Sequence, residues 1–186
     1  MTTRRHLIAL GAAVLVGGVA GLAGCAAPQP ADYAAQSPKL DLKEYFKGRV
    51  RGWGMVQDRS GKVLRRFVVS IDGQWELRDG RWQGILDEHF EWSDGERQRR
   101  VWRLQEEAPG RYRGEAGDVI GGATGTSAGP VLNWAYQLRI PYGNDSIDVR
   151  LDDWMILIDE GTLLNRAEMR YFGLRVGELT IAFRRE

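Results

Sequence analysis

The chain has 186 residues, which is enough for one domain with a hydrophobic core. It carries 26 Lys and Arg against 25 Asp and Glu, and this balance gives no electrostatic basis for binding nucleic acid. One cysteine cannot form an internal disulfide, and with only two histidines the chain lacks a His/Cys cluster for a metal ion. We therefore expect neither a metal nor a cofactor.

Residues 1–24 have the pattern of a secretory signal peptide. Arg4 and Arg5 precede an apolar run that ends in Leu22-Ala23-Gly24-Cys25. The small residues before Cys25 are typical of a lipoprotein signal, so we expect its thiol to be acylated. The alternative is an uncleaved anchor, but the run is short and glycine-rich for a span that needs about 20 apolar residues. The paired arginines also resemble a twin-arginine signal, so the export route stays open.

The residues around the cleavage point indicate a location and a tether. Ala26 follows the cysteine, where an Asp would favour retention in the inner membrane, so we expect an outer-membrane lipoprotein that faces the periplasm. Residues 25–39 are rich in Ala, Pro, Gln and Ser and predict a flexible tether from the lipidated cysteine. Residues 40–186 are then a single domain, and we expect a monomer bound to the membrane through acylated Cys25.

A short helix is predicted at the start of this domain. Asp41-Leu42-Lys43-Glu44 matches a capping box, and Gly48 is a suitable stop, so the helix should run over residues 42–47. No later segment has the period of an amphipathic helix.

After Gly48, short β-rich segments are separated by turn signals at intervals of about ten residues. Gly, Asp and Asn supply the positive φ angles that tight hairpins need. The predicted turns are 58–61, 72–73, 79–80, 93–95, 109–110, 128–130, 143–145 and 159–161. Between them lie about nine or ten strands. The fold class is all-β: an antiparallel up-and-down meander that closes into a barrel, because closure removes its exposed edges.

Alternation predicts which side chains face inward. The clearest apolar stripe has Trp134, Tyr136, Leu138 and Ile140, and Leu179, Ile181 and Phe183 form another. Other inward stripes include polar residues: Gln98 and Arg100 share a face with Trp102 and Leu104, and Asp118 shares one with Tyr112, Gly114 and Ala116. A solid core rarely accepts such groups, so they favour an enclosed, partly polar cavity. The alternative places them at strand ends in solvent.

The glycine-rich run 117–129 is the most unusual local composition. Gly121 to Thr126 resembles a phosphate loop superficially, but no Lys-Ser/Thr follows and no strand-to-helix context exists. We interpret the run as a strand of small residues that leaves room for a bulky neighbour or a ligand.

Catalytic candidates are few. His89 is the only histidine outside the signal, and its strand has no nucleophile elbow, so we expect no catalytic residue there. Asp152 and Asp153 are adjacent, so in a strand they point to opposite faces. The inward one needs a partner, for which Arg100, Arg150, Asn165 and Arg166 are candidates. We favour a structural salt bridge with an arginine over a clamp for a ligand headgroup.

Several motifs together resemble a family of bacterial lipoproteins known as domain of unknown function 3833. They are Asp58-Arg59-Ser60-Gly61-Lys62, Ser93-Asp94-Gly95-Glu96, Arg100-Val101-Trp102, Asp118-Val119-Ile120-Gly121, Asp152-Asp153-Trp154-Met155, Asn165-Arg166-Ala167, Phe172-Gly173 and Val176-Gly177-Glu178. The chain is also similar to the calycin barrels, the lipocalin and fatty-acid-binding group. That likeness implies a calycin-like barrel in which Trp53, early in the first strand, is covered by Arg184 or Arg185.

Three functions remain open at this point. The leading hypothesis is a barrel that binds a lipid or another small amphipathic ligand. The alternatives are an enzyme, an isomerase or hydrolase, that uses Asp118, Asp152 or Asp153 as its base, and an envelope scaffold with a filled core. The residues predicted to bind the ligand are Arg100, Trp102, Asp118, Trp134, Tyr136, Leu138, Asp153, Trp154 and Asn165.

Overall fold

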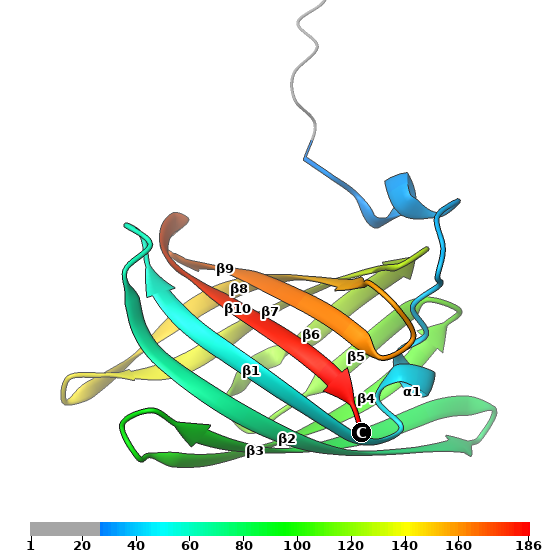
Figure 1. The fold of residues 1–186 in the computed structure, drawn as a ribbon, viewed down its shortest axis with the longest axis horizontal. Coiled ribbons are helices and arrows are strands. Elements are labelled where there is room, and N and C mark those ends of the chain that lie inside the picture. Colours follow the sequence, from blue (N-terminus) through cyan, green and yellow to red (C-terminus); the bar gives the residue numbers. More distant parts are fainter. Residues whose placement is uncertain (1–26) are drawn as a thin grey trace, which may run out of the picture.

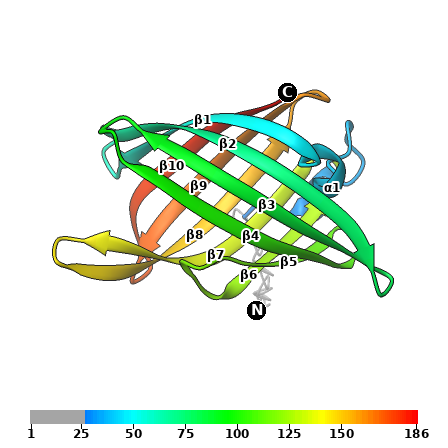
Figure 2. The same cartoon turned by 90° about the horizontal axis from the view of Figure 1, so that it is seen from below.

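The computed structural model describes residues 27–186, in which ten antiparallel strands close into a barrel (Figures 1 and 2). The predicted signal peptide and Cys25 lie outside the described residues. The strands are β1 Gly48–Asp58, β2 Val63–Arg78, β3 Arg81–Trp92, β4 Arg97–Ala108, β5 Arg111–Glu115, β6 Val119–Ala128, β7 Val131–Tyr142, β8 Asp145–Leu157, β9 Thr162–Tyr171 and β10 Leu174–Arg185.

Each strand pairs with its neighbours in sequence, and β1 pairs with β10 from Val50–Arg185 to Asp58–Gly177 to close the sheet. The predicted all-β, up-and-down barrel of about nine or ten strands is therefore confirmed. Closure gives every strand two partners, which leaves no long edge open to another chain. None of the described residues form a helix long and apolar enough to cross a membrane.

The predicted turn at Asp72-Gly73 is wrong, because both residues lie inside the 16-residue strand β2. Gly73 serves a close approach instead: a Cβ atom there would overlap the backbone carbonyl of Phe46. Glycines at positive φ do occupy the expected hairpins, as at Gly61, Gly95 and Gly110.

The short helix α1, Leu42–Tyr45, closes one end of the barrel. It ends before Lys47, two residues earlier than predicted. The Asp41 carboxylate caps it by accepting a hydrogen bond from the Lys43 backbone N–H at 3.1 Å. Leu42 and Phe46 are buried in the barrel core, and the Phe46 ring meets Phe183 edge-on at 5.8 Å. This end of the barrel is therefore sealed by apolar side chains.

A 3₁₀ turn, η1 Pro30–Tyr33, packs on the outside of the barrel. Pro30 is buried, and the Tyr33 ring lies 6.3 Å from Trp154 of β8. Farther along, the Leu40 N–H donates to the Gly129 carbonyl at 2.8 Å. These contacts hold part of the segment against the barrel, which differs from the flexible tether predicted over all of 25–39.

Small residues in β5 and β6 make room for a large one inside the barrel. A Cβ at Gly125 would overlap the Trp134 ring, and one at Gly114 would come within 2.6 Å of it. The interpretation of the glycine-rich run as a strand that accommodates a bulky neighbour is thus confirmed.

Trp53 does not have the role that the calycin likeness implied. Its side chain is about half exposed on the outer face, where the Arg51 guanidinium lies 5.6 Å from the ring. Because Gly52 and Gly54 face inward beneath Phe183 and Phe67, the alternation sends Trp53 outward. Arg184 and Arg185 are exposed strand-end residues, and the cation over the Trp53 ring is Arg51.

Candidate functional site

The barrel encloses a cavity of about 530 Å³, within the usual size range of small-molecule sites. Leu42 and Phe46 of the α1 end form its floor. At the opposite end the lining residues Val56, Trp92 and Leu179 are only partly buried, so the cavity opens there. A filled core, as the scaffold hypothesis required, is not what the structure shows.

The walls of the cavity are mainly apolar and aromatic. Trp102 of β4 meets the rings of Trp134 and Tyr136 of β7 edge-on, at centroid distances of 5.7 and 5.4 Å. Phe67 and Phe90 pack together on the β2–β3 side at 5.4 Å. Such surfaces bind hydrocarbon chains or rings chiefly by excluding water from both partners.

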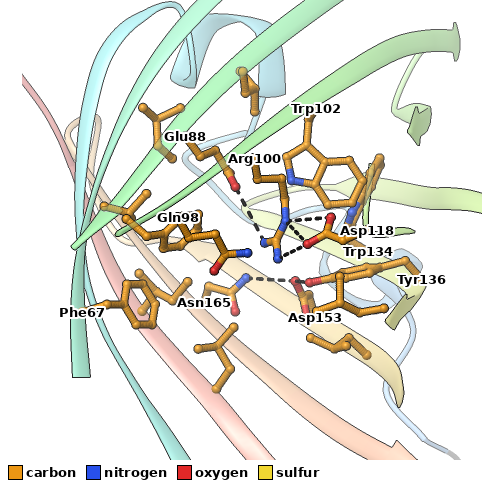
Figure 3. Close-up of a pocket in the computed structure, with 18 of the residues that line it drawn as sticks. Phe67, Glu88, Gln98, Arg100, Trp102, Asp118, Trp134, Tyr136, Asp153 and Asn165 are labelled. Atoms are coloured by element: carbon orange, nitrogen blue, oxygen red, sulfur yellow. Dashed lines mark hydrogen bonds and ion pairs between the residues drawn. The ribbon is translucent and has the colours of Figure 1, made fainter. Parts of the chain in front are cut away.

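A first group of polar side chains inside the cavity consists of Arg100, Asp118 and Glu88, called the Arg100 cluster below (Figure 3). The Arg100 Nε donates to both Asp118 oxygens at 3.1 and 3.0 Å, and its Nη2 donates to Oδ2 at 2.7 Å. Its Nη1 lies 3.8 Å from Glu88 Oε2. Two carboxyl groups thus surround a single buried guanidinium.

Burial and charge act in opposite directions on this cluster. Burial raises the pKa of Glu88 to about 7, although the nearby Arg100 charge works against that rise. Burial alone would lower the pKa of Arg100, but Glu88 and Asp118 raise it overall, so the guanidinium stays charged. The Arg100 side chain is therefore already neutralised by protein groups.

A second group, called the Asp153 cluster, consists of Asp153, Tyr136 and Asn165. The Asp153 side chain of β8 points inward, and its Oδ2 accepts long hydrogen bonds from the Tyr136 hydroxyl at 3.4 Å and from Asn165 Nδ2 at 3.5 Å. Asp153 Oδ1 and Asn165 Oδ1 are buried and have no hydrogen-bond partner among the described residues. Burial raises the pKa of Asp153 to about 7 and holds that of Tyr136 well above its usual value.

The two adjacent aspartates are divided as alternation requires. Asp152 faces outward, where it accepts a 2.6 Å hydrogen bond from Asn133 Nδ2. The prediction that the inward aspartate meets an arginine is wrong: within residues 27–186 Asp153 has no ion pair, and its partners are a hydroxyl and an amide. Arg166 pairs with Glu178 on the outside, and Arg150 is exposed.

Eight of the nine predicted ligand-binding residues line the cavity. They are Arg100, Trp102, Asp118, Trp134, Tyr136, Leu138, Asp153 and Asn165. Trp154 is the exception, because it follows Asp153 directly and so projects outward onto Tyr33. His89 is likewise exposed on the outer face, 3.2 Å from Asp87.

Glu88 is the main lining residue that sequence reasoning missed as a site residue. It lies between Leu86 and Phe90 on the inner face of β3, two positions from each. The alternation of that strand carried this signal, since two apolar residues two positions away mark the same face.

A closed antiparallel barrel with an apolar plug at one end, an open mouth and a partly polar interior defines a calycin-like barrel. The chain belongs to DUF3833, described as a protein family of unknown function, whose profile matches residues 19–185. No protein with a curated description matches the sequence.

Two solved structures are similar in fold. The S-type phycobiliprotein lyase CPES from Guillardia theta matches with a TM-score of 0.50 and 8% identity, covering 86% of this chain and 99% of the lyase. A DUF3598 protein of unknown function from Nostoc punctiforme matches with a TM-score of 0.47 and 12% identity, over 81% of this chain and 51% of that one. At this identity the likeness to the lyase concerns the fold alone.

Proposed function

We propose that this barrel binds a small amphipathic molecule, such as a single-chain lipid, in its interior. The observation that carries the proposal is the cavity of about 530 Å³, whose walls are aromatic and aliphatic and whose depth holds buried polar groups. An apolar pocket with a few convergent polar groups suits a ligand with an apolar chain and one polar end. A cavity of this kind is more than packing of the fold requires.

We also propose that the protein works as a lipoprotein of the outer membrane, on its periplasmic side. The support is the sequence Leu22-Ala23-Gly24-Cys25 after an apolar run, with Ala26 in the sorting position. Labelled palmitate should enter the wild-type protein in cells, and Cys25→Ser should remain unlabelled. Labelling of Cys25→Ser would contradict this assignment.

Native mass spectrometry tests the binding proposal. Protein extracted gently from membranes should carry an additional mass that is lost on denaturation, and the delipidated barrel should take up single-chain lipids at one per chain. A barrel that is ligand-free on extraction and that takes up no single-chain lipid would overturn the proposal.

A second candidate, an enzyme of proton transfer, is favoured by the two carboxyl groups buried in the cavity wall, those of Asp153 and Glu88. Asp153 and Glu88 both have pKa values near 7 inside the cavity, and general acids and bases work best near the operating pH. The mass of the ligand recovered after prolonged incubation separates the two functions. An unchanged mass supports binding, and a changed mass that depends on Asp153 or Glu88 supports catalysis.

A further inference from the structure

Two oxygen atoms in the cavity wall are hydrogen-bond acceptors without donors. They are Asp153 Oδ1 and Asn165 Oδ1, which lie on neighbouring strands β8 and β9 and have no partner in the described part of the chain. Both residues are almost completely buried, with exposed fractions of 4% and 2%. Buried polar atoms in proteins are nearly always hydrogen-bonded, so two such atoms in one wall of a cavity indicate a missing donor.

Three donors near this point, on Tyr136, Asn165 and Arg100, are already directed to other atoms. The Tyr136 hydroxyl and the Asn165 amide nitrogen both point to Asp153 Oδ2, which leaves Oδ1 open. The Arg100 guanidinium is directed to Asp118 and Glu88 instead. Figure 3 shows the two clusters side by side, with separate sets of contacts. When Asp153 is ionised, none of these three side chains therefore supplies the missing donor.

The charges of the interior act against an anionic ligand. In the depth of the cavity, three carboxyl groups accompany one guanidinium, and Asp118 occupies that guanidinium with three hydrogen bonds; these carboxyl groups are those of Glu88, Asp118 and Asp153. The other two lining arginines, Arg65 and Arg139, form ion pairs with acids outside this group. A carboxylate or phosphate placed here would lose its hydration and gain no free cation. A hydroxyl or ammonium group would instead supply donors where acceptors are open.

We infer that the Asp153 cluster is a subsite for a headgroup that donates hydrogen bonds, a hydroxyl or an ammonium, and that it discriminates against carboxylate and phosphate heads. This inference rests on the proposed function, since it specifies the polar end of the amphipath in the same cavity. Asp153 Oδ1 and Asn165 Oδ1 accept from the headgroup. The chain extends past Tyr136 and Leu138 toward the mouth at Val56 and Leu179, along lining that is mostly apolar.

Four ligands with one chain and different heads test the inference: dodecylamine, dodecanol, dodecanoate and dodecyl phosphate. Binding to the delipidated barrel is measured by titration calorimetry at pH 7.5. The amine and the alcohol should bind at least roughly tenfold more tightly than either acid, the ratio expected when a buried acceptor gains or lacks its donor. Equal or tighter binding of dodecanoate or dodecyl phosphate would overturn the inference and leave the proposed function standing.

Substitutions locate the subsite and separate its two possible heads. Asp153→Asn keeps the shape and an acceptor but removes the charge, so it should weaken dodecylamine about tenfold and dodecanol much less. Asp153→Leu removes the acceptor and should weaken both to the level of the acids. Asp152→Asn changes the adjacent carboxylate on the outer face and should leave every affinity unchanged.

The remaining outcomes also decide the matter. If Asp153→Asn and Asp153→Leu remain folded by circular dichroism and bind the amine and the alcohol like the wild type, the headgroup lies elsewhere and the inference fails. If a folded wild-type barrel binds none of the four ligands, the proposed function and this inference fall together.

Discussion

The two polar clusters inside the barrel differ in how completely their hydrogen bonds are satisfied. In the Arg100 cluster, one guanidinium makes three hydrogen bonds to Asp118 and lies 3.8 Å from Glu88. In the Asp153 cluster, the only hydrogen bonds are 3.4 and 3.5 Å long, and two buried oxygens have none among the described residues. The difference suggests a division of roles: the first cluster holds the barrel together, and the second is left open for a ligand.

Removal of the arginine should give the largest effect. Arg100→Met leaves the Glu88 and Asp118 carboxyls buried without their cation, so the free energy of unfolding should fall by about 3 kcal/mol. Urea denaturation measures it. Arg99→Met is the matched control, because Arg99 is the next residue but pairs with Asp87 on the outer surface. An equal decrease in the free energy of unfolding for the two variants would contradict a structural role of the Arg100 cluster.

The second prediction concerns the Asp153 carboxyl, which should make the free energy of unfolding depend on pH. Its pKa is about 7 in the folded barrel and ordinarily 3.8, so the folded state holds a proton that the unfolded chain releases. This contribution to stability is complete below pH 3.8 and is lost as the pH rises through 7. Asp153→Asn has no carboxyl group at this position and does not lose this stability. Between pH 5 and 6.5, its free energy of unfolding relative to that of wild type should therefore rise by about 1 kcal/mol per pH unit.

Urea denaturation at several pH values measures this slope, and Asp152→Asn should run parallel to wild type. Glu88, whose pKa is also about 7, contributes in the same direction in every variant that keeps it and therefore cancels from the comparison. Parallel curves for Asp153→Asn and wild type would mean that the Asp153 carboxyl is not desolvated.

Ligand binding should show a smaller pH effect. An ammonium head prefers ionised Asp153, so the affinity for dodecylamine should rise about tenfold between pH 6 and 8. The affinity for dodecanol should stay within about twofold, because a hydroxyl donates to either form. The charged and titratable groups that act on Asp153 are Tyr136, Asp152 and Arg100. Glu88 and Asp118 also act on Tyr136.

Titration calorimetry across this range gives the comparison. Asp153→Asn should abolish the pH dependence for the amine, whereas Glu88→Gln should preserve it. If Glu88→Gln abolished it and Asp153→Asn did not, the Arg100 cluster would be the ligand subsite, and the division of roles would be reversed.

The smallest effect is expected on the outer face. Trp154→Phe should leave ligand affinity within about twofold of wild type, because this ring packs on Tyr33 outside the barrel. In contrast, Trp102→Phe should reduce the change in tryptophan fluorescence when ligand binds, because Trp102 lines the cavity together with Trp92 and Trp134. A large loss of binding in Trp154→Phe would show that residues outside the barrel participate.

The fold and most of the cavity lining were predictable from local patterns. Glycine and aspartate turns at regular spacing predict hairpins, and alternation in β7 assigns Trp134, Tyr136 and Leu138 to the interior. The same rule excludes Trp154 once Asp153 is placed inside. A stricter use of alternation would also have included Glu88.

The contacts of the clusters depend on information that the sequence does not express locally. Asp153 meets Tyr136 and Asn165 because the β7–β8 and β8–β9 registers bring them together. Arg100 of β4 reaches Asp118, which lies in the turn before β6. Gly73 resembled a turn residue because a glycine required by a distant carbonyl, that of Phe46, looks the same in sequence. The predictions that failed are therefore those that depend on strand register and on packing between residues distant in the sequence.

The most direct test of the Asp153 subsite is a ¹³C NMR titration of the Asp153 side-chain carboxyl with and without dodecylamine, assigned by the loss of its signal in Asp153→Asn. The free barrel should titrate with a midpoint near 7, and bound amine should lower the midpoint by about one unit or more. A midpoint near the ordinary 3.8 in the free barrel, or one that saturating amine leaves unchanged, would contradict the account.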